Sequence, residues 1–368
     1  MKYRDAVLCY QETQSSDDSS KPIDLDITDP VSALGFEFEA VNGTTNNQNN
    51  PLSHCIEKIE LVDGADVLAS LSFRQAQALQ WYKTGKQPFL RLDESPSQGD
   101  VIGCMILFGR YLWDKEYALN LAAFKNPKLK ITWDLGHTRA VSATTAFATG
   151  TLKISVWAKI MEGQSPPGRY LMAKEIESWT GGTSGDKRCE LPLDYAYRMM
   201  MLLTYLAGND IDENISKIKL TADTDKFIAF ERYVKQLDAE MAQRFGSCVL
   251  WKRLHATSGD IVWVPVNKEP QVNLRPIAAD IIPFYDWAWS GRFRLYLEDY
   301  ASAAISTDKE IHSTIEGHAL HASLPIPMGI LAEPDTWFDP TEYKKLELVC
   351  TEAAAAANSL VIEQVRPN

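Results

Sequence analysis

Alternation of apolar and polar residues is the dominant pattern along this chain, and it predicts β-strands. Residues 128–134, 152–160 and 292–298 alternate, with Leu129, Ile131 and Trp133 on the apolar face of the first segment. A shorter alternation covers residues 36–40. A period of two residues with one polar face is typical of antiparallel sheets that are buried on one side.

Two stretches show helical spacing instead. Ser72 and Gln75 have the spacing of a capping box, and a short apolar face follows them up to Gly85. The second stretch ends at Gly246 and carries apolar residues at helical spacing, namely Phe230, Tyr233, Val234, Leu237 and Met241. The sequence therefore predicts few helices among many strands.

A short segment occurs twice. Residues 56–61 and residues 215–220 both read I-x-K-I-x-L, and the second copy begins 159 residues after the first. A predicted helix follows each copy, which indicates two similar domains in tandem. The Met-rich run 199–205 suits a helix by propensity, but the repeat aligns Tyr195 with Phe36 and so predicts a strand.

The pattern predicts an all-β protein made of two tandem eight-stranded jelly-roll β-sandwiches with a few short helices. Residues 1–30 contain a polar, acidic stretch and are predicted to form an N-terminal arm, with a loosely packed strand over 11–30 as the alternative. The first jelly roll is predicted over 31–163 and the second over 168–368, divided at Pro166-Pro167. Four long irregular stretches are expected between strands, at 135–149, 180–190, 267–282 and 328–345.

Composition excludes several classes of protein. The chain has 368 residues, 45% hydrophobic and 23% charged, which is normal for folded domains. A net charge of -12 argues against sequence-independent binding of nucleic acid. The sequence contains no apolar run long enough for a membrane span and begins without an apolar signal core. The six cysteines are far apart in sequence, which predicts free, buried thiols made in a reducing compartment.

The histidines are the first candidates for chemistry. His312, Glu316 and His318 share the parity of one strand face, and His321 follows them. A metal-binding cupin would use such residues, but its H-x-H pair is missing. A polar strand face near an interface is the favoured interpretation.

Other motifs also favour structural roles. The carboxylate pairs Asp63/Asp66 and Asp223/Asp225 adjoin the repeated strand and predict turns. The glycine-rich residues 181–188 lack the order of a phosphate-binding loop and predict a mobile surface loop. The sequence therefore predicts no catalytic, cofactor-binding or metal-binding residues.

Three passages resemble the double jelly-roll major capsid proteins of tailless icosahedral viruses, the lineage of tectiviruses and adenoviruses. They are the strand pair and helix at 56–82, the segment 108–131 with its Asn126-Pro127 turn, and the Ala-rich run that leads into Asn358-Ser359-Leu360-Val361-Ile362. Many members continue into a glycine-containing strand after the Asn, whereas this sequence ends at Val365-Arg366-Pro367-Asn368.

The resemblance implies a structural protein without catalysis and without cofactors. It implies a homotrimer of two-barrel subunits that tiles a virion shell, made in the host cytoplasm, and a bacteriophage member in particular. Its implied partners are other copies of itself, penton or membrane-associated proteins and an internal viral membrane, without specific nucleic-acid binding. Two alternatives stay open: a minor vertex or spike protein, and a glycan-binding or glycan-processing protein that uses Trp287 and Trp289 beside Asp286.

Overall fold

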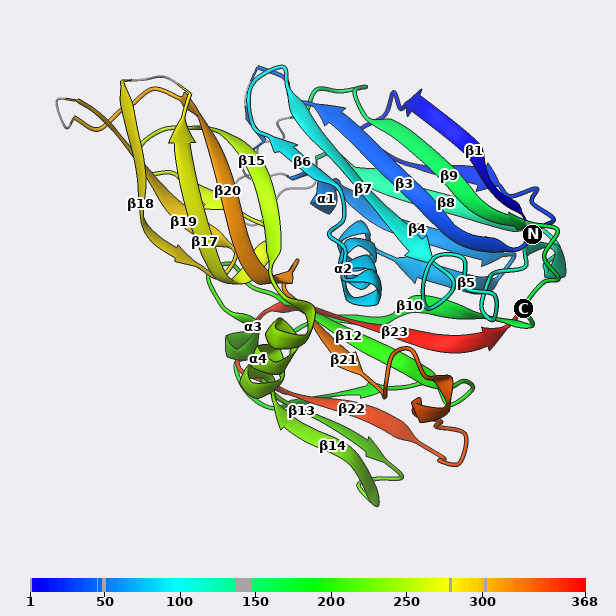
Figure 1. Ribbon diagram of the computed structural model, residues 1–368. Helices are drawn as coiled ribbons and strands as arrows, with labels where there is room; N and C mark the ends of the chain where they lie inside the picture. The colour runs from blue at the N-terminus through cyan, green and yellow to red at the C-terminus, as the bar shows by residue number, and fades with distance from the viewer. Residues whose placement is uncertain (1, 45, 48–50, 137–146, 278–279, 301–302) are drawn as a thin grey trace.

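The computed structural model describes residues 2–44, 46–47, 51–136, 147–277, 280–300 and 303–368. Figure 1 shows three bodies built mainly from strands: a barrel at the upper right, a second barrel below it, and a group of long strands at the upper left. The N- and C-termini lie at the same end of the molecule. No helix in the described ranges is long and apolar enough to cross a membrane.

The first barrel consists of two four-stranded layers. One layer has the order β1 (Lys2–Thr13), β9 (Lys153–Glu162), β3 (Val31–Val41) and β7 (Gly99–Leu107). The facing layer has the order β2 (Asp18–Asp24), β8 (Pro127–Asp134), β4 (Ile56–Asp63) and β5 (Asp66–Leu71). Numbered along the barrel, these are strands 1-8-3-6 and 2-7-4-5, which is the strand order of a jelly roll.

The second barrel repeats that order. Its first layer runs β10 (Arg169–Thr180), β23 (Ala357–Pro367), β12 (Tyr197–Tyr205) and β21 (Ser323–Pro327). Its second layer runs β11 (Asp186–Glu190), β22 (Leu346–Glu352), β13 (Ile215–Ala222) and β14 (Phe227–Tyr233). The prediction of two tandem jelly-roll sandwiches is confirmed, and the repeated segments form the equivalent strands β4 and β13.

The helices are duplicated as well. One-turn helices α1 (Leu52–Cys55) and α3 (Ile211–Asn214) precede β4 and β13, and the 12-residue helices α2 (Phe73–Thr84) and α4 (Val234–Phe245) follow β5 and β14. Ser72 and Gln75 form the predicted capping box, and Gly85 ends α2 in the left-handed conformation. The predicted start of the second helix was too early, because Phe230 and Tyr233 belong to β14. Two 3-10 turns complete the set, η1 (Leu121–Ala123) and η2 (Pro334–Thr336).

The barrels differ in the connection that follows the 12-residue helix, from α2 to β7 in the first barrel and from α4 to β21 in the second. In the first barrel the connection contains only the short strand β6 (Leu90–Asp93). In the second barrel it spans residues 246–322 and contains six strands, which we call the insertion. They are β15 (Cys248–Ala256), β16 (Ile261–Trp263), β17 (Val266–Pro276), β18 (Ile281–Trp289), β19 (Arg292–Asp299) and β20 (Lys309–Leu320).

Parallel pairing joins the three bodies into two continuous eight-stranded sheets. Strand β6 of the first barrel pairs with β15, so the insertion strands β15, β20 and β17 extend the first layer of the first barrel. Strand β5 pairs with β10, so the second layer of the first barrel continues into the first layer of the second barrel. The remaining insertion strands form a separate sheet of order β16-β19-β18.

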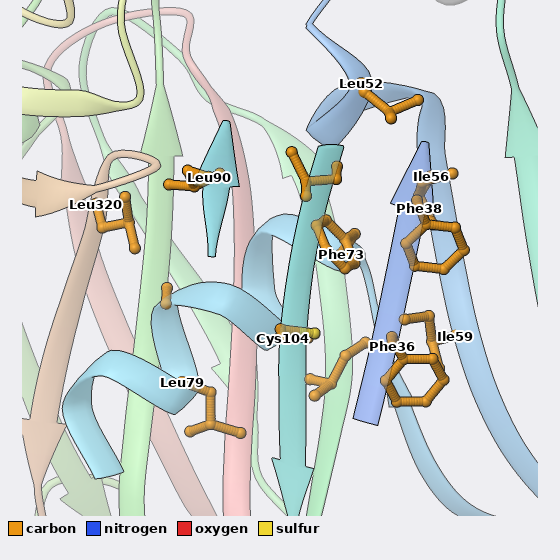
Figure 2. Close-up of a cluster of buried hydrophobic side chains, with 14 of the residues drawn as sticks. Phe36, Phe38, Leu52, Ile56, Ile59, Phe73, Leu79, Leu90, Cys104 and Leu320 are labelled. Atoms are coloured by element: carbon orange, nitrogen blue, oxygen red, sulfur yellow. The ribbon is translucent and has the colours of Figure 1, made fainter. Parts of the chain in front are cut away.

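The core of the first barrel extends beyond the sandwich. Phe38 on β3 meets Phe73 of α2 edge to face, with ring centroids 5.1 Å apart. Leu52 of α1 and Ile56 of β4 belong to the same cluster (Figure 2). Met199 and Met201 of β12 belong to this core, whereas Met200 and Leu202 belong to the core of the second barrel. Strand β12 is therefore covered on both faces, which explains its uninterrupted apolar run.

Two hairpin turns carry a duplicated contact. The carboxylate of Asp63, between β4 and β5, accepts hydrogen bonds from the backbone amides of Lys125 (3.1 Å) and Asn126 (2.7 Å), just before β8. In the second barrel, Asp223 accepts from the amides of Lys344 (2.8 Å) and Lys345 (3.2 Å), just before β22. The turn role predicted for these aspartates is confirmed, and in both barrels the turn also anchors the next long connection.

Several predicted boundaries were wrong. Residues 2–13 and 18–24, assigned to an arm, supply β1 and β2, without which the first barrel would have six strands; both strands are largely exposed. The stretch 267–282 lies mostly in β17 and β18, and the stretch 180–190 contains β11. The stretch 328–345 is irregular apart from η2, as predicted, and most of 135–149 lies outside the described residues.

Candidate assembly surfaces

The junction between the two barrels shows how one barrel of this chain binds another. Strand β10 lies parallel to β5, with Lys174 opposite Ser70. The ring of Tyr170 is fully buried there, beside Phe108, and its hydroxyl donates to the carbonyl of Leu68 at 3.4 Å. The edge of the second barrel that strand β10 would otherwise expose is thus covered by the first barrel.

Helix α2 fills the space above the same layer of the second barrel. The amide nitrogen of Gln75 donates to Ser359 at 3.0 Å and also contacts Glu175, and the hydroxyl of Tyr82 donates to the carbonyl of Ser323 at 3.0 Å. Gln75 and Tyr82 of α2 therefore satisfy groups of the second barrel, whereas Gln77 and Gln80 bond to the backbone of β7 in the first barrel. Together these bonds explain how a helix with several glutamines can be buried on nearly every side.

A buried group of charges lies at this junction. Glu363 of β23 forms ion pairs with Lys83 of α2 and with Arg198 of β12, and all three side chains are at most 2% exposed. Burial alone would raise the pKa of Glu363, but the two cations and their hydrogen bonds outweigh burial and hold that pKa below its usual value. Burial lowers the pKa of Lys83 to about 8, against the opposing effect of Glu363. Glu363 and Lys83 therefore form a charged pair at neutral pH.

Two barrel edges that correspond to the junction remain exposed. Strand β1 is the counterpart of β10, and its Tyr3, Val7 and Tyr10 are 55%, 68% and 72% exposed. Strand β14 is the counterpart of β5, and it exposes Ile228 and Tyr233 by 45% and 60%. Large apolar side chains on open strand edges are typical of surfaces that bind another chain.

The insertion carries a second exposed aromatic surface. Trp251 of β15 and Trp289 of β18 are 69% and 54% exposed. Between its strands, the guanidinium of Arg292 lies 5.5 Å from the ring centroid of Trp263 and 5.2 Å from that of Trp287. These cation–π contacts connect the side chains of β16, β19 and β18, the three strands of the small outer sheet.

The histidine candidates lie on β20 or, in the case of His321, directly after it, and they have different surroundings. His312 and Glu316 share its exposed face, as their parity predicts, and Glu316 accepts a hydrogen bond from Ser247. The ring of His318 contacts the carbonyl of Gly246 at 3.0 Å. His321 is buried and meets Gln77 of α2 at 2.7 Å. Across the residues that the structure describes, no group of three His, Cys, Asp or Glu side chains is arranged to hold a metal ion.

The glycan candidates lie in the insertion, where Asp286 is 3.9 Å from the guanidinium of Arg294. Trp287 contacts Arg292 and is partly buried, whereas Asp286 and Trp289 are both exposed. The glycine-rich residues 181–188 form the turn between β10 and β11 and the start of β11, and the amide of Gly182 donates to Glu352 at 2.8 Å. This contact ties the turn to the barrel, in place of the predicted mobile loop.

Comparisons with known proteins agree with this architecture. No protein-family model matches the chain, and no curated protein matches it in sequence. Solved structures do match over nearly the whole length. The STIV MCP, from Sulfolobus turreted icosahedral virus, has a TM-score of 0.60 at 10% identity, covering 99% of this chain and 96% of that one.

Two further structures give the same result. The major capsid protein P2 from bacteriophage PM2 has a TM-score of 0.53 at 10% identity, covering 100% of this chain and 97% of that one. PBCV-1 VP54, fitted into a reconstruction of the virophage Sputnik, has a TM-score of 0.54 at 10% identity and covers 99% and 93%. The chain has the double jelly-roll fold. At this level of identity the likeness establishes the fold, as the resemblance implied, and it gives the glycan alternative no support.

Within the double jelly roll, the residues best placed for a function are those on open barrel edges. The sequence pattern did not mark them, because Tyr3, Val7 and Tyr10 fell within the predicted arm and Tyr233 within the predicted second helix. A detectable signal was present: β1 and β10 are both 12 residues long, and aligning their first residues places Tyr3 on Tyr170, Ala6 on Ala173 and Thr13 on Thr180.

Proposed function

We propose that this chain is a structural major capsid protein whose trimers tile an icosahedral virion shell, without catalysis. The observation that carries the proposal is the internal duplication. Two jelly rolls of identical strand order lie side by side in one chain, so three chains supply six similar barrels around one axis. A head-to-tail contact that closes after three copies gives such a ring.

The proposal includes the location and partners of the protein. It is made in the host cytoplasm, assembles with copies of itself, and contacts penton or membrane-associated proteins and an internal viral membrane at special positions. It makes no specific contact with nucleic acid. The double jelly-roll fold shared with the PM2 major capsid protein supports the shell function, and membership among bacteriophages stays a prediction.

The test is to purify the chain and measure its mass by light scattering and its outline by electron microscopy. A trimer with a hexagonal outline is expected. Mass spectrometry of purified virions should find the chain as the most abundant shell protein, whereas a vertex or spike protein would be present in few copies. A monomer at all concentrations, without hexagonal particles and without a place in virions, would contradict the proposal.

A further inference from the structure

The junction inside the chain predicts which surfaces join one copy to the next. It is head to tail, because β5 of the first barrel meets β10 of the second. The strands that correspond to these two by position in the jelly roll are β14 and β1. Neither is covered within the described part of the chain, and Figure 1 places them at opposite ends of the molecule.

We propose that β1 of one copy binds β14 of a second copy, parallel to it, with Tyr3 in the position that Tyr170 occupies in the internal junction. The inference rests on the proposed function, since a ring of copies needs this contact to close. It names the residues of the contact, which the function alone does not.

Local geometry supports the equivalence of β5 and β14. Each pairs with its preceding strand through a hairpin that is interrupted by a β-bulge, after Leu61 in the first barrel and after Leu220 in the second. Each leads into a 12-residue helix, capped at Ser72 and at Tyr233. Aligning the caps places Ser70 on Glu231 and Leu68 on Ala229.

The strands on the other side of the two contacts, β10 in the internal junction and β1 in the proposed one, also correspond. Both have 12 residues and a register shift near their middle, between Glu175 and Glu177 in β10 and between Val7 and Cys9 in β1. Aligned on their first residues, Lys174 falls on Val7. The internal pair Lys174–Ser70 therefore predicts that Val7 lies opposite Glu231 of the neighbouring copy.

The residues of the internal junction are buried and their counterparts on β1 and β14 are exposed, as expected if these two strands bind a second copy. Ser70 is 4% exposed and Tyr170 fully buried in the internal junction. Their counterparts Glu231 and Tyr3 are exposed, although the Tyr3 ring contacts Trp113 of its own chain at 4.5 Å between centroids. Docking would bring the hydroxyl of Tyr3 near the carbonyl of Ala229 of the second copy, as Tyr170 lies near Leu68.

A charge-reversal experiment tests the register. Val7→Glu places a carboxylate opposite Glu231, and is expected to weaken trimer formation at least about 100-fold in sedimentation equilibrium. Adding Glu231→Lys should restore trimers to within about tenfold of wild type; it costs little by itself, since the pair of Glu231 with Lys217 is exposed. Ile282→Glu, at a 46% exposed residue of β18, which Figure 1 shows away from both β1 and β14, is the matched control and should leave the trimer intact.

A disulfide test identifies the contact directly. Val7→Cys and Glu231→Cys are combined in a chain whose half-buried Cys9 is replaced by serine; the other five cysteines are buried. Parallel neighbours are close enough for a disulfide, so oxidation should give covalent trimers on a non-reducing gel. Each single variant should give none.

The outcomes separate the inference from the proposed function. Dissociation by Val7→Glu with rescue by Glu231→Lys, together with cross-linked trimers, supports the inference. Trimers that tolerate Val7→Glu and do not cross-link would overturn it and leave the proposed function standing. A wild-type protein that is always monomeric would overturn both. An unchanged far-UV circular dichroism spectrum of Val7→Glu serves as the folding control, because Val7 is 68% exposed.

Discussion

Helices α2 and α4 occupy equivalent places in the two barrels but lie in different surroundings. Both have 12 residues and follow the fifth barrel strand. Helix α2 is buried on nearly every side because the second barrel covers it, whereas α4 buries a narrow stripe of Val234, Leu237, Asp238 and Met241 and exposes the rest. Within the described residues, a second barrel covers α2, whereas no third barrel covers α4.

This difference distinguishes the burial that a helix needs to close its own barrel from the burial that contact with a second barrel adds. A helix at this place needs only one apolar stripe to close its own barrel, as α4 shows. The additional burial of α2 arises from the contact between the barrels, in which Gln75 bonds Ser359 and Lys83 pairs with Glu363. Comparing equivalent residues in the two barrels therefore separates the stability of a barrel from the stability of the junction.

The largest difference is expected at the buried charges of the junction. Glu363→Gln keeps the shape of the side chain but leaves Lys83 and Arg198 without a counter-charge, and should lower the free energy of unfolding by about 3–5 kcal/mol. Lys159→Ala on the corresponding strand β9 is the control: its pair with Asp5 is partly exposed and is worth about 0–1 kcal/mol. Urea denaturation measures both, and equal losses would contradict a special role for the junction.

A smaller and pH-dependent effect is expected at Asp238 of α4. Burial raises its pKa to about 6, so between about pH 4 and pH 6 the folded chain binds more protons than the unfolded chain. The stability contributed by the protonated carboxyl is thus present at low pH and is lost as pH rises through 6. Asp238→Asn should stabilise the protein by about 1–2 kcal/mol at pH 7, with a smaller gain near pH 5.

Asp100 of β7 provides the matched comparison for that variant. Burial raises its pKa to about 6 as well, although the amides of Leu52 and Asp93 donate to its two oxygens, each at 3.1 Å. Asp100→Asn would leave one of these amides without an acceptor, at a cost of about 1–3 kcal/mol. It should therefore be no more stable than wild type at pH 7. Thermal melting at pH 5 and pH 7 checks both variants, and a gain for Asp100→Asn would refute this account.

The smallest effects are expected at the two turn aspartates. Asp63→Ala and Asp223→Ala each remove an acceptor of two backbone hydrogen bonds at a partly exposed site, and each should cost about 1 kcal/mol. Similar losses would support equivalent roles in the two barrels. A loss confined to one variant in chemical denaturation would show that only one barrel depends on the anchor.

The sequence predicted the duplicated architecture because the most regular strands lie inside the sheets. Strands β4, β8, β9 and β13 each have a strand on both sides, so their apolar alternation is clear. The Met-rich strand β12 lacks alternation because both of its faces are buried, and only the repeat identified it.

The strands that the prediction missed share one property. Strands β1, β2, β11 and β17 each lie at the edge of a sheet. Edge strands tolerate proline and carry polar residues, as Pro22 in β2 and Pro270 and Pro276 in β17 show, so their sequences resemble loops. The candidate contact surface was missed for the same reason, since it consists of two edges.

The parallel pairing of β6 with β15 has a consequence for unfolding. Along the chain, the insertion interrupts the second barrel, yet its main sheet is hydrogen-bonded to the first barrel, through Trp251 opposite Arg91 and Arg253 opposite Asp93. Cooperative units follow hydrogen bonds and packing instead of chain order. The backbone amides of β15 should therefore exchange with solvent together with those of β6 and β7. The first barrel would then protect β15 from exchange, although β15 lies within the sequence of the second barrel.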